Sequence, residues 1–497
     1  MKKILLNYLI FLPLLMECLF LNEQNRKKLI SIKFKLILVL SFVSASLWAQ
    51  PPHTFTADGS VVIPAGITTM DIQAWGAGGA GGGAGSSGLL NGRSGGGGGG
   101  GAYAHGLITV NPLSGVPLSV KVAGANAGTT ATGTTGGSST IQGFEGVILA
   151  VGGAGGTANT AGGAPAGGAG GLAAASIGSI STATGSTGGS GNTIVLGLTL
   201  TSGAGGTAGG TGGGAGGAAL STLLLGNGPG NSGSPPGGGG SGGLQTALNS
   251  PQLGGSGAHG QVIVTYTCPT YNITGISAAN VCITSPTSLV TVTASAASLP
   301  VGIYNVTYSR GTPAATGLSA TMTVSAAGTG NFTAVGLTTV GTSSITVTAL
   351  TSGVCTSPIS GIVANVTISP TTVAGSVSGG TAICNGAPSA LLSLAGNTGA
   401  VIRWESSVAP FSTWLPIVNT ATTYTSGALT ETTQFRAVVQ SGACTALNSG
   451  LTTVTVNPLP QGSLSANGPF CATGAGQLTF TATSGVGPYT IVYNDGT

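Results

Sequence analysis

Hydrophobic and polar residues follow two different patterns along this chain. From residue 267 onward, short runs such as SLVTVTASA, SITVTAL and TTVTV alternate apolar with polar positions. That period of two is typical of β-strands with one buried and one exposed face. Between residues 71 and 260, blocks of glycine instead alternate with short apolar inserts such as HGLITV and GVILAVGG. The pattern predicts a mainly β chain whose first part is built around glycine.

The glycine blocks are compatible with few structures. The strict every-third glycine of a collagen helix is absent, and proline is sparse there. A disordered linker would be polar and poor in aliphatic residues, whereas this segment is rich in Ala, Leu, Val and Ile. Extended glycine helices can pack side by side, because backbones without Cβ atoms come close enough to hydrogen-bond to one another. We favour such packed helices, with a linker as the alternative.

The chain contains the glycine spacing of a dinucleotide-binding fingerprint without the other features of that motif. Gly76, Gly78 and Gly81 follow a β-like run and are spaced G-x-G-x-x-G. The fingerprint needs a helix directly after it and an acidic residue about 20 positions further on. Glycine recurs too often for a helix to begin, and the next carboxylate after Asp71 is Glu145. We therefore expect no cofactor site here.

Other sequence motifs of catalytic and metal sites also lack the features that these sites require. Two G-x-S-x-G sequences, at 92–96 and 239–243, lack the strand-to-helix turn that exposes a nucleophile. No C-x-x-C pair occurs, and the three histidines lie far from the cysteines of the later part of the chain. Within the residues given, we interpret the chain as a non-enzyme without catalytic or metal-binding residues.

Charge is concentrated at the N-terminus. Only 4% of the 497 residues are charged, and seven of the twelve Lys and Arg residues lie in the first 35 positions. The nearly uncharged remainder offers no cationic surface for nucleic acid. Lysines between 27 and 35 precede an apolar run at 36–48, which predicts a signal peptide over about 27–49. We expect an extracellular or cell-surface chain with no membrane span after processing.

Cysteines mark a repeat in the second part of the chain. SGVCTSP at 352–358 matches SGACTAL at 441–447, and a proline precedes each of Cys282, Cys384 and Cys471 by 13 or 14 residues. Widely spaced cysteines in an exported chain favour disulfides. If each unit opens with one cysteine and closes with another, Cys282 pairs with Cys355 and Cys384 with Cys444, each pair stapling one β-sandwich.

The remaining cysteines have no assigned partner. Cys268 is left without a partner in this scheme, and an alternative bridge joins Cys355 to Cys384 across the boundary between units. The third unit stops in a strand followed by a hairpin-type Asn-Asp-Gly turn. We therefore expect the given chain to be a fragment in which Cys471 pairs with a cysteine beyond residue 497.

Two resemblances to known families follow. FTADGSVVIPAGITTMDIQAWGAGGAGGG, GGGGAYAHGLITV and GGSGAHGQVIVTY resemble the glycine-rich domain of bacterial surface proteins and phage tail-tip adhesins. In the tail-tip relatives the resemblance implies stacked glycine helices and ligand specificity in aromatic-bearing loops. Here Phe144 is the only aromatic residue between 104 and 265, which places a sugar-stacking site in doubt.

The second resemblance lies in ICNGAPSALLSLAGNTGAVIRWESS and the segment that ends QSGACT. It is similar to the Ig-like repeats of large surface proteins in gliding bacteria that use type IX secretion. This resemblance implies that Trp404 is the core tryptophan of a sandwich. It also implies that further repeats and a C-terminal region for the secretion machinery follow residue 497.

The expected organisation has five parts. They are a leader at 1–50, a glycine-rich domain at 51–266, Ig-like β-sandwiches at 267–369 and 370–457, and the start of a third Ig-like unit at 458–497.

Few side chains are candidates for a ligand site. His105 and His259 precede strands, and we interpret them as polar strand-end residues rather than a metal pair because carboxylates are few. Trp414 is a weak candidate for stacking on a glycan, although a place over the sandwich core is favoured. Arg403 and Glu405 flank Trp404 and are expected together on the solvent face.

These observations predict an exported, non-catalytic adhesin- or matrix-like protein that presents a glycine-rich domain on an Ig-like stalk. Its partner would be an extracellular ligand, either a glycan or another surface protein. An alternative is the non-catalytic arm of a secreted polysaccharide-degrading enzyme whose catalytic domain follows residue 497. A minor alternative is an ice-binding surface formed by glycine helices that carry Thr and Ala.

Overall fold

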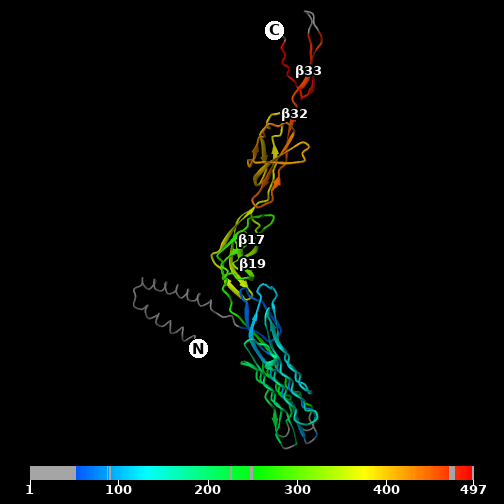
Figure 1. The fold of residues 1–497 in the computed structure, drawn as a ribbon, viewed down its shortest axis with the longest axis vertical. Coiled ribbons are helices and arrows are strands. Elements are labelled where there is room, and N and C mark those ends of the chain that lie inside the picture. The colour runs from blue at the N-terminus through cyan, green and yellow to red at the C-terminus, as the bar shows by residue number, and fades with distance from the viewer. Residues whose placement is uncertain are drawn as a thin grey trace, which may run out of the picture. The chain divides into compact units, whose positions relative to one another are not determined.

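A computed structural model describes residues 52–86, 88, 91–195, 198–223, 226–246, 250–468 and 476–494. The expected leader and Cys471 lie outside these residues. The chain divides into two compact units. The first contains the residues up to Tyr271 together with 300–304 and 351–357, and the second contains the rest. Almost every regular element is a strand (Figure 1), so the predicted mainly β fold class is confirmed.

A five-stranded antiparallel sheet begins and ends the glycine-rich domain. Its strands, in spatial order, are β1 (His53–Phe55), β14 (Gln261–Thr265), β3 (Thr69–Trp75), β5 (Tyr103–Thr109) and β9 (Ser181–Ala183). The last strand, β14, inserts between the first and the third, so the two ends of the domain pair with each other. Alternate residues of β3, such as Met70 and Ile72, are buried.

A second, four-stranded sheet packs on the first. Its order is β2 (Gly59–Val61), β6 (Leu118–Lys121), β7 (Ser139–Gln142) and β8 (Val147–Ala150). Ile141 and Ile148 from this sheet are fully buried, as is Ile108 of β5. Burying a side chain of this size contributes about 1.5–3 kcal/mol. The shorter elements of the domain are β4 (Asn91–Ser94), η3 (Ala173–Ala175), β10 (Thr193–Val195), β11 (Leu200–Thr201), β12 (Ser221–Thr222) and β13 (Leu244–Gln245).

The glycine blocks form a bundle of extended helices with three residues per turn. In the run 95–102, every third N–H donates to the same neighbouring run. One such set is Gly95 to Gly243, Gly98 to Gly240 and Gly101 to Gly237, with N···O distances of 2.8–2.9 Å. The other N–H groups of this run donate to 151–157 and 186–189, and its carbonyls accept from 76–82, 168–171 and 203–209.

The central run therefore has six hydrogen-bonded neighbours. A threefold extended helix has no internal hydrogen bonds, so the contacts between helices satisfy backbone groups that would otherwise be buried and unpaired. A Cβ atom on Gly98 would collide with the carbonyl of Gly79. The sequence prediction of packed glycine helices is confirmed, and the linker alternative is wrong.

The first Ig-like module is a continuous sheet wrapped around an apolar core. Its spatial order is β15 (Gly275–Ala278), β17 (Thr287–Thr293), β20 (Thr329–Val335), β19 (Ala315–Ala326), β18 (Gly302–Arg310), β21 (Gly341–Ser352), β23 (Val363–Ser369) and β16 (Val281–Cys282), with β22 (Cys355–Pro358) paired to β21. The fully buried side chains include Val290, Tyr308, Phe332 and Ile345. They come from alternate positions of the strands, as the Thr/Val pattern predicts.

The second module is a β-sandwich. Its smaller sheet has the order β24 (Ser376–Ser378), β26 (Leu392–Ala395) and β29 (Thr423–Tyr424). The larger sheet has the order β25 (Ala382–Cys384), β32 (Thr452–Asn457), β30 (Thr433–Gln440), β27 (Ala400–Val408) and β28 (Leu415–Ile417), with β31 (Leu447–Asn448) paired to β30. Trp404 has no exposed surface and donates from Nε1 to the carbonyl of Ala421 at 2.9 Å, as expected for the core tryptophan.

The last described strands are β33 (Gln461–Ala466) and β34 (Leu478–Ser484), which form an antiparallel pair. In the part of the chain that the structure describes, no helix has the length and apolarity required to cross a bilayer.

Candidate functional site

A disulfide within the first compact unit joins two segments that are 87 residues apart in the sequence. Cys268 bonds to Cys355, the first residue of β22, which directly follows the turn after β21. In the same turn, the Ser352 hydroxyl oxygen accepts from the backbone N–H of Ala65 at 2.7 Å and donates to the carbonyl of Ile303 at 2.6 Å. The turn therefore lies directly on the segment that connects β2 to β3.

Two tyrosines fill the space behind this contact. The hydroxyl of Tyr271 donates to the carbonyl of Ala65 at 2.9 Å, and its ring meets Tyr304 edge-on with centroids 5.0 Å apart. Burial raises the pKa of Tyr271 to about 12 and also raises the pKa of Tyr304. Both rings therefore stay neutral and act as packing groups.

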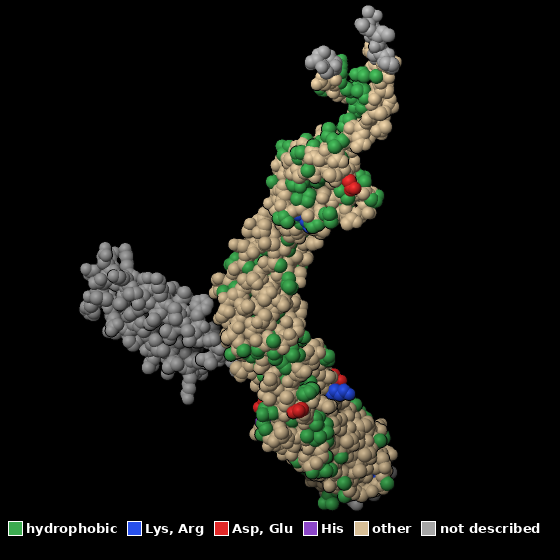
Figure 2. All heavy atoms as spheres, turned by 45° about the horizontal axis from the view of Figure 1, so that its top comes forward, with side chains coloured by type: hydrophobic (Ala, Val, Ile, Leu, Met, Phe, Trp, Pro, Cys, Tyr) green, Lys and Arg blue, Asp and Glu red, His purple; other side chains and the backbone are tan. Residues whose placement is uncertain are grey.

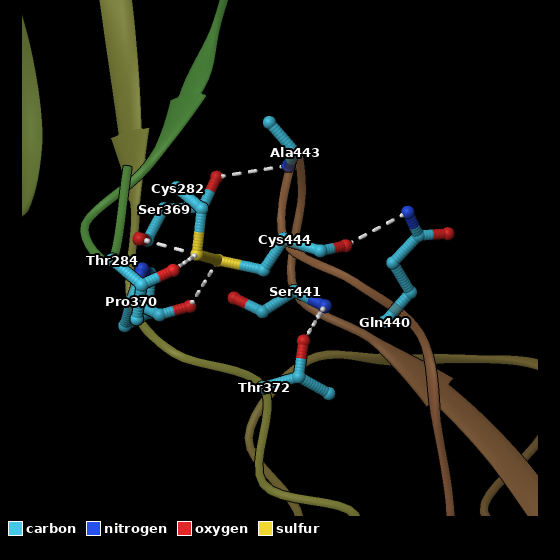
Figure 3. The surroundings of a disulfide bond; sticks show 9 residues. All are labelled: Cys282, Thr284, Ser369, Pro370, Thr372, Gln440, Ser441, Ala443 and Cys444. Atoms are coloured by element: carbon cyan, nitrogen blue, oxygen red, sulfur yellow. Dashed lines mark hydrogen bonds between the residues drawn. A yellow bond between two sulfur atoms is a disulfide. The ribbon is translucent and has the colours of Figure 1, made fainter. Parts of the chain in front are cut away.

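A second disulfide, Cys282–Cys444, ties the two Ig-like modules to each other (Figure 3). Cys282 ends β16, and Cys444 lies in the turn between β30 and β31. Around the bond, the backbone N–H of Ala443 donates to the Ser369 hydroxyl at 3.2 Å, and the N–H of Ser441 donates to the Thr372 hydroxyl at 3.1 Å. The turn of the second module therefore lies directly on the last strand of the first.

The turns that carry Cys355 and Cys444 share a sequence pattern. Each has the sequence Ser-Gly-x-Cys, at 352–355 and at 441–444, and we call them the S-G-x-C turns. Each glycine has a positive φ, +58° for Gly353 and +48° for Gly442. A Cβ atom on Gly442 would collide with the Ser369 hydroxyl, and one on Gly353 would lie 3.1 Å from the carbonyl oxygen of Val62. Glycine is therefore required by both the backbone conformation and the close contact.

The expected disulfide pairing is wrong. Cys355 bonds to Cys268 rather than to Cys282, and Cys444 bonds to Cys282 rather than to Cys384. The physical reason is that the turn at 352–355 lies on Ala65, which precedes Cys268, and the turn at 441–444 lies on Ser369, which pairs with Cys282. A signal was available in the sequence, because pairing inside each module leaves Cys268 without a partner. Cys384 is free and exposed.

A buried carboxylate forms a charged cluster on the larger sheet of the second module. Glu405 is only 6% exposed. Its Oε1 atom accepts from Arg403 at 2.7 and 2.8 Å, and its Oε2 atom accepts from Arg436 at 2.7 Å through two guanidinium nitrogens. Burial alone would raise the pKa of this carboxyl, but the hydrogen bonds from the two arginines outweigh it and lower the pKa.

The expected position of this pair needs a correction. Arg403 and Glu405 do share a face, but Glu405 is covered rather than exposed to solvent. The cause is Arg436, which lies directly opposite Glu405 on the neighbouring strand. Sequence reasoning did not identify Arg436, whose partner is fixed by strand register.

Trp414 belongs to this cluster. Its ring is half-buried, and the guanidinium carbon of Arg436 lies 3.9 Å from the ring centroid. One face of the ring therefore makes a cation–π contact. The buried core around Trp404 is made by other residues, so the favoured place of Trp414 over the core is wrong.

His105 and His259 each have a polar neighbour rather than a set of metal-ligating side chains. His105 Nε2 lies 2.9 Å from an Asp71 carboxylate oxygen, and His259 Nδ1 lies 2.7 Å from the carbonyl of Gly260. No group of three or more His, Cys, Asp or Glu side chains that could hold a metal ion comes together among the described residues.

The G-x-G-x-x-G spacing belongs to the glycine bundle. Gly76, Gly78 and Gly81 donate to the carbonyls of Ala102, Ala258 and Gly255 at 2.9–3.0 Å. A Cβ atom on any of the three would collide with a backbone carbonyl of a neighbouring run. Their backbone donors are therefore used inside the bundle.

Phe144 lies at the rim of an open cleft in the glycine-rich domain. Its side chain is 72% exposed. The cleft has a volume of about 380 Å³ and is lined mainly by apolar residues of neighbouring loops and strands, including Ile63, Val110, Val116, Pro117 and Leu118. The ring and the cleft together form an exposed apolar surface, and the sequence had offered Phe144 only as an isolated aromatic.

The comparisons with protein families match two segments of the chain. Residues 54–267 match the glycine-rich domain family. A second segment, residues 373–458, matches a domain of unknown function. No curated protein matches the chain.

Two solved structures align with part of the chain. The FN1–FN3 domains of chicken CNTN1 align with 41% of this chain and 71% of their own, at 10% identity and a TM-score of 0.27. A marsupial T cell receptor aligns with 41% of this chain and 78% of its own, at 14% identity and a TM-score of 0.17.

Proposed function

We propose that this chain is an exported, non-catalytic adhesin- or matrix-like protein that presents its glycine-rich domain on Ig-like modules. The observation that carries the proposal is the pair of disulfides, of which Cys282–Cys444 joins two consecutive Ig-like modules. Disulfides persist in oxidising compartments outside the cytoplasm. Disulfides that join distant segments and one module to the next suit a protein that must stay folded while it is exposed outside the cell.

The glycine-rich domain suits the role of a presented surface. Its interior is fixed by hydrogen bonds between helices, while its loops carry exposed apolar side chains such as Phe144, Leu172 and Ile180. Figure 2 shows a face on which uncharged polar groups and backbone predominate and apolar side chains form scattered groups. The ligand class that fits such a surface is an uncharged one, namely a glycan or another surface protein. The cleft beside Phe144 is the place where we expect it to bind.

The test compares cells that carry the full gene with cells in which codons 54–267 are deleted in frame. Intact cells are treated with protease and probed with an antibody against the Ig-like modules, and adhesion to glycan-coated and protein-coated surfaces is measured. We expect loss of the surface signal on protease treatment and lower adhesion only in the deletion strain. Protease-resistant, intracellular protein would overturn export. Equal adhesion of the two strains would overturn the adhesive role, and hydrolysis of polysaccharide by the purified protein would overturn the non-catalytic role.

A further inference from the structure

We propose that the free Cys384 forms a second disulfide between consecutive Ig-like modules, equivalent to Cys282–Cys444. The surface around Cys384 and Asn457 would bind the S-G-x-C turn of an Ig-like module that follows residue 457 in the same chain. The inference goes beyond the adhesive role, since it concerns how the modules are joined to one another. It rests on a contact that the structure already contains one module earlier.

Cys384 and Cys282 occupy the same place in their modules. Each cysteine is the last residue of a short strand that pairs in parallel with the last long strand of its module. Cys282 lies opposite Ser369, and Cys384 lies opposite Asn457. A proline follows in both cases, at 370 and at 458.

The same backbone hydrogen bonds occur around Cys282 and around Cys384. Ile283 donates to the carbonyl of Ser369 at 3.0 Å, and Asn385 donates to the carbonyl of Asn457 at 3.0 Å. In the turn that follows, Ser285 donates to the carbonyl of Cys282 at 2.9 Å. The matching bond runs from Ala387 to the carbonyl of Cys384 at 3.0 Å. The receiving surface is therefore already formed at Cys384.

The two places differ in what covers them. In the first module, Ser369 is 6% exposed and Thr372 is 4% exposed, because the S-G-x-C turn of the second module lies on them. In the second module the matched Asn457 is half-buried and the matched Pro460 is exposed. Leu459, between them, is 56% exposed. The same surface is thus present but uncovered, with a free thiol at its centre.

The chemistry of the uncovered surface fits the same occupant. The Ser369 hydroxyl accepts from the backbone N–H of Ala443, and the side-chain oxygen of Asn457 can accept an equivalent bond. The occupant needs glycine before its variable residue, because a side chain there would collide with the side chain at position 457, as Gly442 shows at Ser369. This excludes an arbitrary thiol-bearing loop and selects the S-G-x-C turn.

Bond formation is an oxidation. The thiols of Cys384 and of the incoming turn lose two protons to solvent and two electrons to the disulfide of an oxidised thiol carrier in the export compartment. That carrier is reduced to two thiols, and one sulfur–sulfur bond forms.

The test supplies the missing occupant from the chain's own sequence. A second copy of residues 370–457 is inserted between Asn457 and Pro458 of the full chain. In the copy, Cys384→Ser removes the competing thiol, and Ala443→Val gives the turn the S-G-V-C sequence of 352–355 and a distinct mass. After oxidation with oxidised glutathione, free thiols are alkylated and the protein is mapped without reduction.

We expect Cys384 to be joined to the cysteine of the copied turn and to be protected from alkylation as fully as Cys282. An alkylated Cys384, or Cys384 joined to Cys471, in molecules with an intact Cys282–Cys444 bond would overturn the proposal. The matched control replaces Cys384 by Ser in the original module and should leave the copied turn alkylated.

A second measurement does not depend on the inserted copy folding. In the exported protein isolated from its own cells, Cys384 should be found in a disulfide with a peptide containing S-G-x-C. A free thiol at Cys384 in that protein would overturn the proposal as well.

Discussion

Cys282 and Cys444 lie 162 positions apart in the sequence and are joined by a disulfide between two consecutive Ig-like modules. The bond does not staple the strands of one sandwich, as the Ig-like pattern led us to expect. It holds the S-G-x-C turn of one module on the last strand of the module before it. The stability of the second unit should therefore depend on coupling between modules.

Removal of this bond should uncouple the modules. We expect the double variant Cys282→Ser, Cys444→Ser to lose about 2–5 kcal/mol of unfolding free energy, because the open chain gains entropy when unfolded. Calorimetry should then resolve the unfolding of the second unit into separate transitions. The control Cys384→Ser removes only a free, exposed thiol and should stay within about 0.5 kcal/mol of the parent. A double variant with a single unchanged transition would contradict the coupling.

The glycine bundle should tolerate almost no side chain in its interior. We expect Gly98→Ala to lower the unfolding free energy of the glycine-rich domain by about 1–3 kcal/mol or more, because the new Cβ atom meets the carbonyl of Gly79. Gly124 is exposed, and a Cβ atom there meets nothing within 4 Å. Gly124→Ala should be neutral or stabilise the domain by up to about 1 kcal/mol, since it restricts the unfolded chain. Urea unfolding of both variants tests this, and similar losses would argue against close packing around Gly98.

Much of the fold could be predicted from the sequence. Glycine at this density, with aliphatic inserts, leaves few ways to satisfy the backbone except helix-to-helix hydrogen bonds, and the Thr/Val alternation indicates half-buried strands. The resemblance to Ig-like repeats placed Trp404 correctly in the core of a sandwich, where it has no exposed surface. The neighbours of each glycine run could not be predicted, because glycine side chains carry no information about partners.

The candidate site was harder to predict because it depends on contacts between distant segments. The repeated sequence motifs around the cysteines are compatible both with bonds within modules and with bonds between them. Only the docking of the S-G-x-C turns decides between the two, and this contact is tertiary. Similarly, alternation placed Arg403 and Glu405 on one face, but the burial of Glu405 comes from Arg436, whose position depends on the register of β27 and β30.

The Glu405 cluster should make the second module sensitive to acid. The lowered pKa of Glu405 means that its stabilising contribution is fully present above the ordinary glutamate pKa of about 4.3. That contribution is lost as the pH falls through the folded-state pKa. Glu405→Gln should lower the unfolding free energy at neutral pH by about 1.5–3 kcal/mol, since charge-assisted hydrogen bonds are lost. It should also flatten the dependence on acid pH.

Urea unfolding followed by tryptophan fluorescence measures this effect. The matched control is Glu431→Gln, which changes the other carboxylate of residues 370–457 at an exposed position. If the pH dependence stays unchanged in Glu405→Gln and disappears in Glu431→Gln, it comes from Glu431, and the prediction for Glu405 is wrong.

Phe144 offers a direct test of the ligand surface. Because its ring is 72% exposed, Phe144→Ala should change the stability of the domain by less than about 0.5 kcal/mol. If the cleft holds the ligand, cell adhesion should fall severalfold. Leu172→Ala, at an exposed position outside the residues that line the cleft, serves as the control. Equal adhesion by the two variants would show that the cleft does not bind the ligand.

The glycine bundle also limits how this protein can evolve. Nearly every codon change at a glycine of the central run adds a side chain where a neighbouring backbone already lies, so a segment that reads as low complexity tolerates little drift. The loops that join the runs are under no such restriction, and additions there leave the bundle intact. New binding preferences should therefore arise through changes in loop length and loop sequence, with the interior inherited as a nearly fixed template.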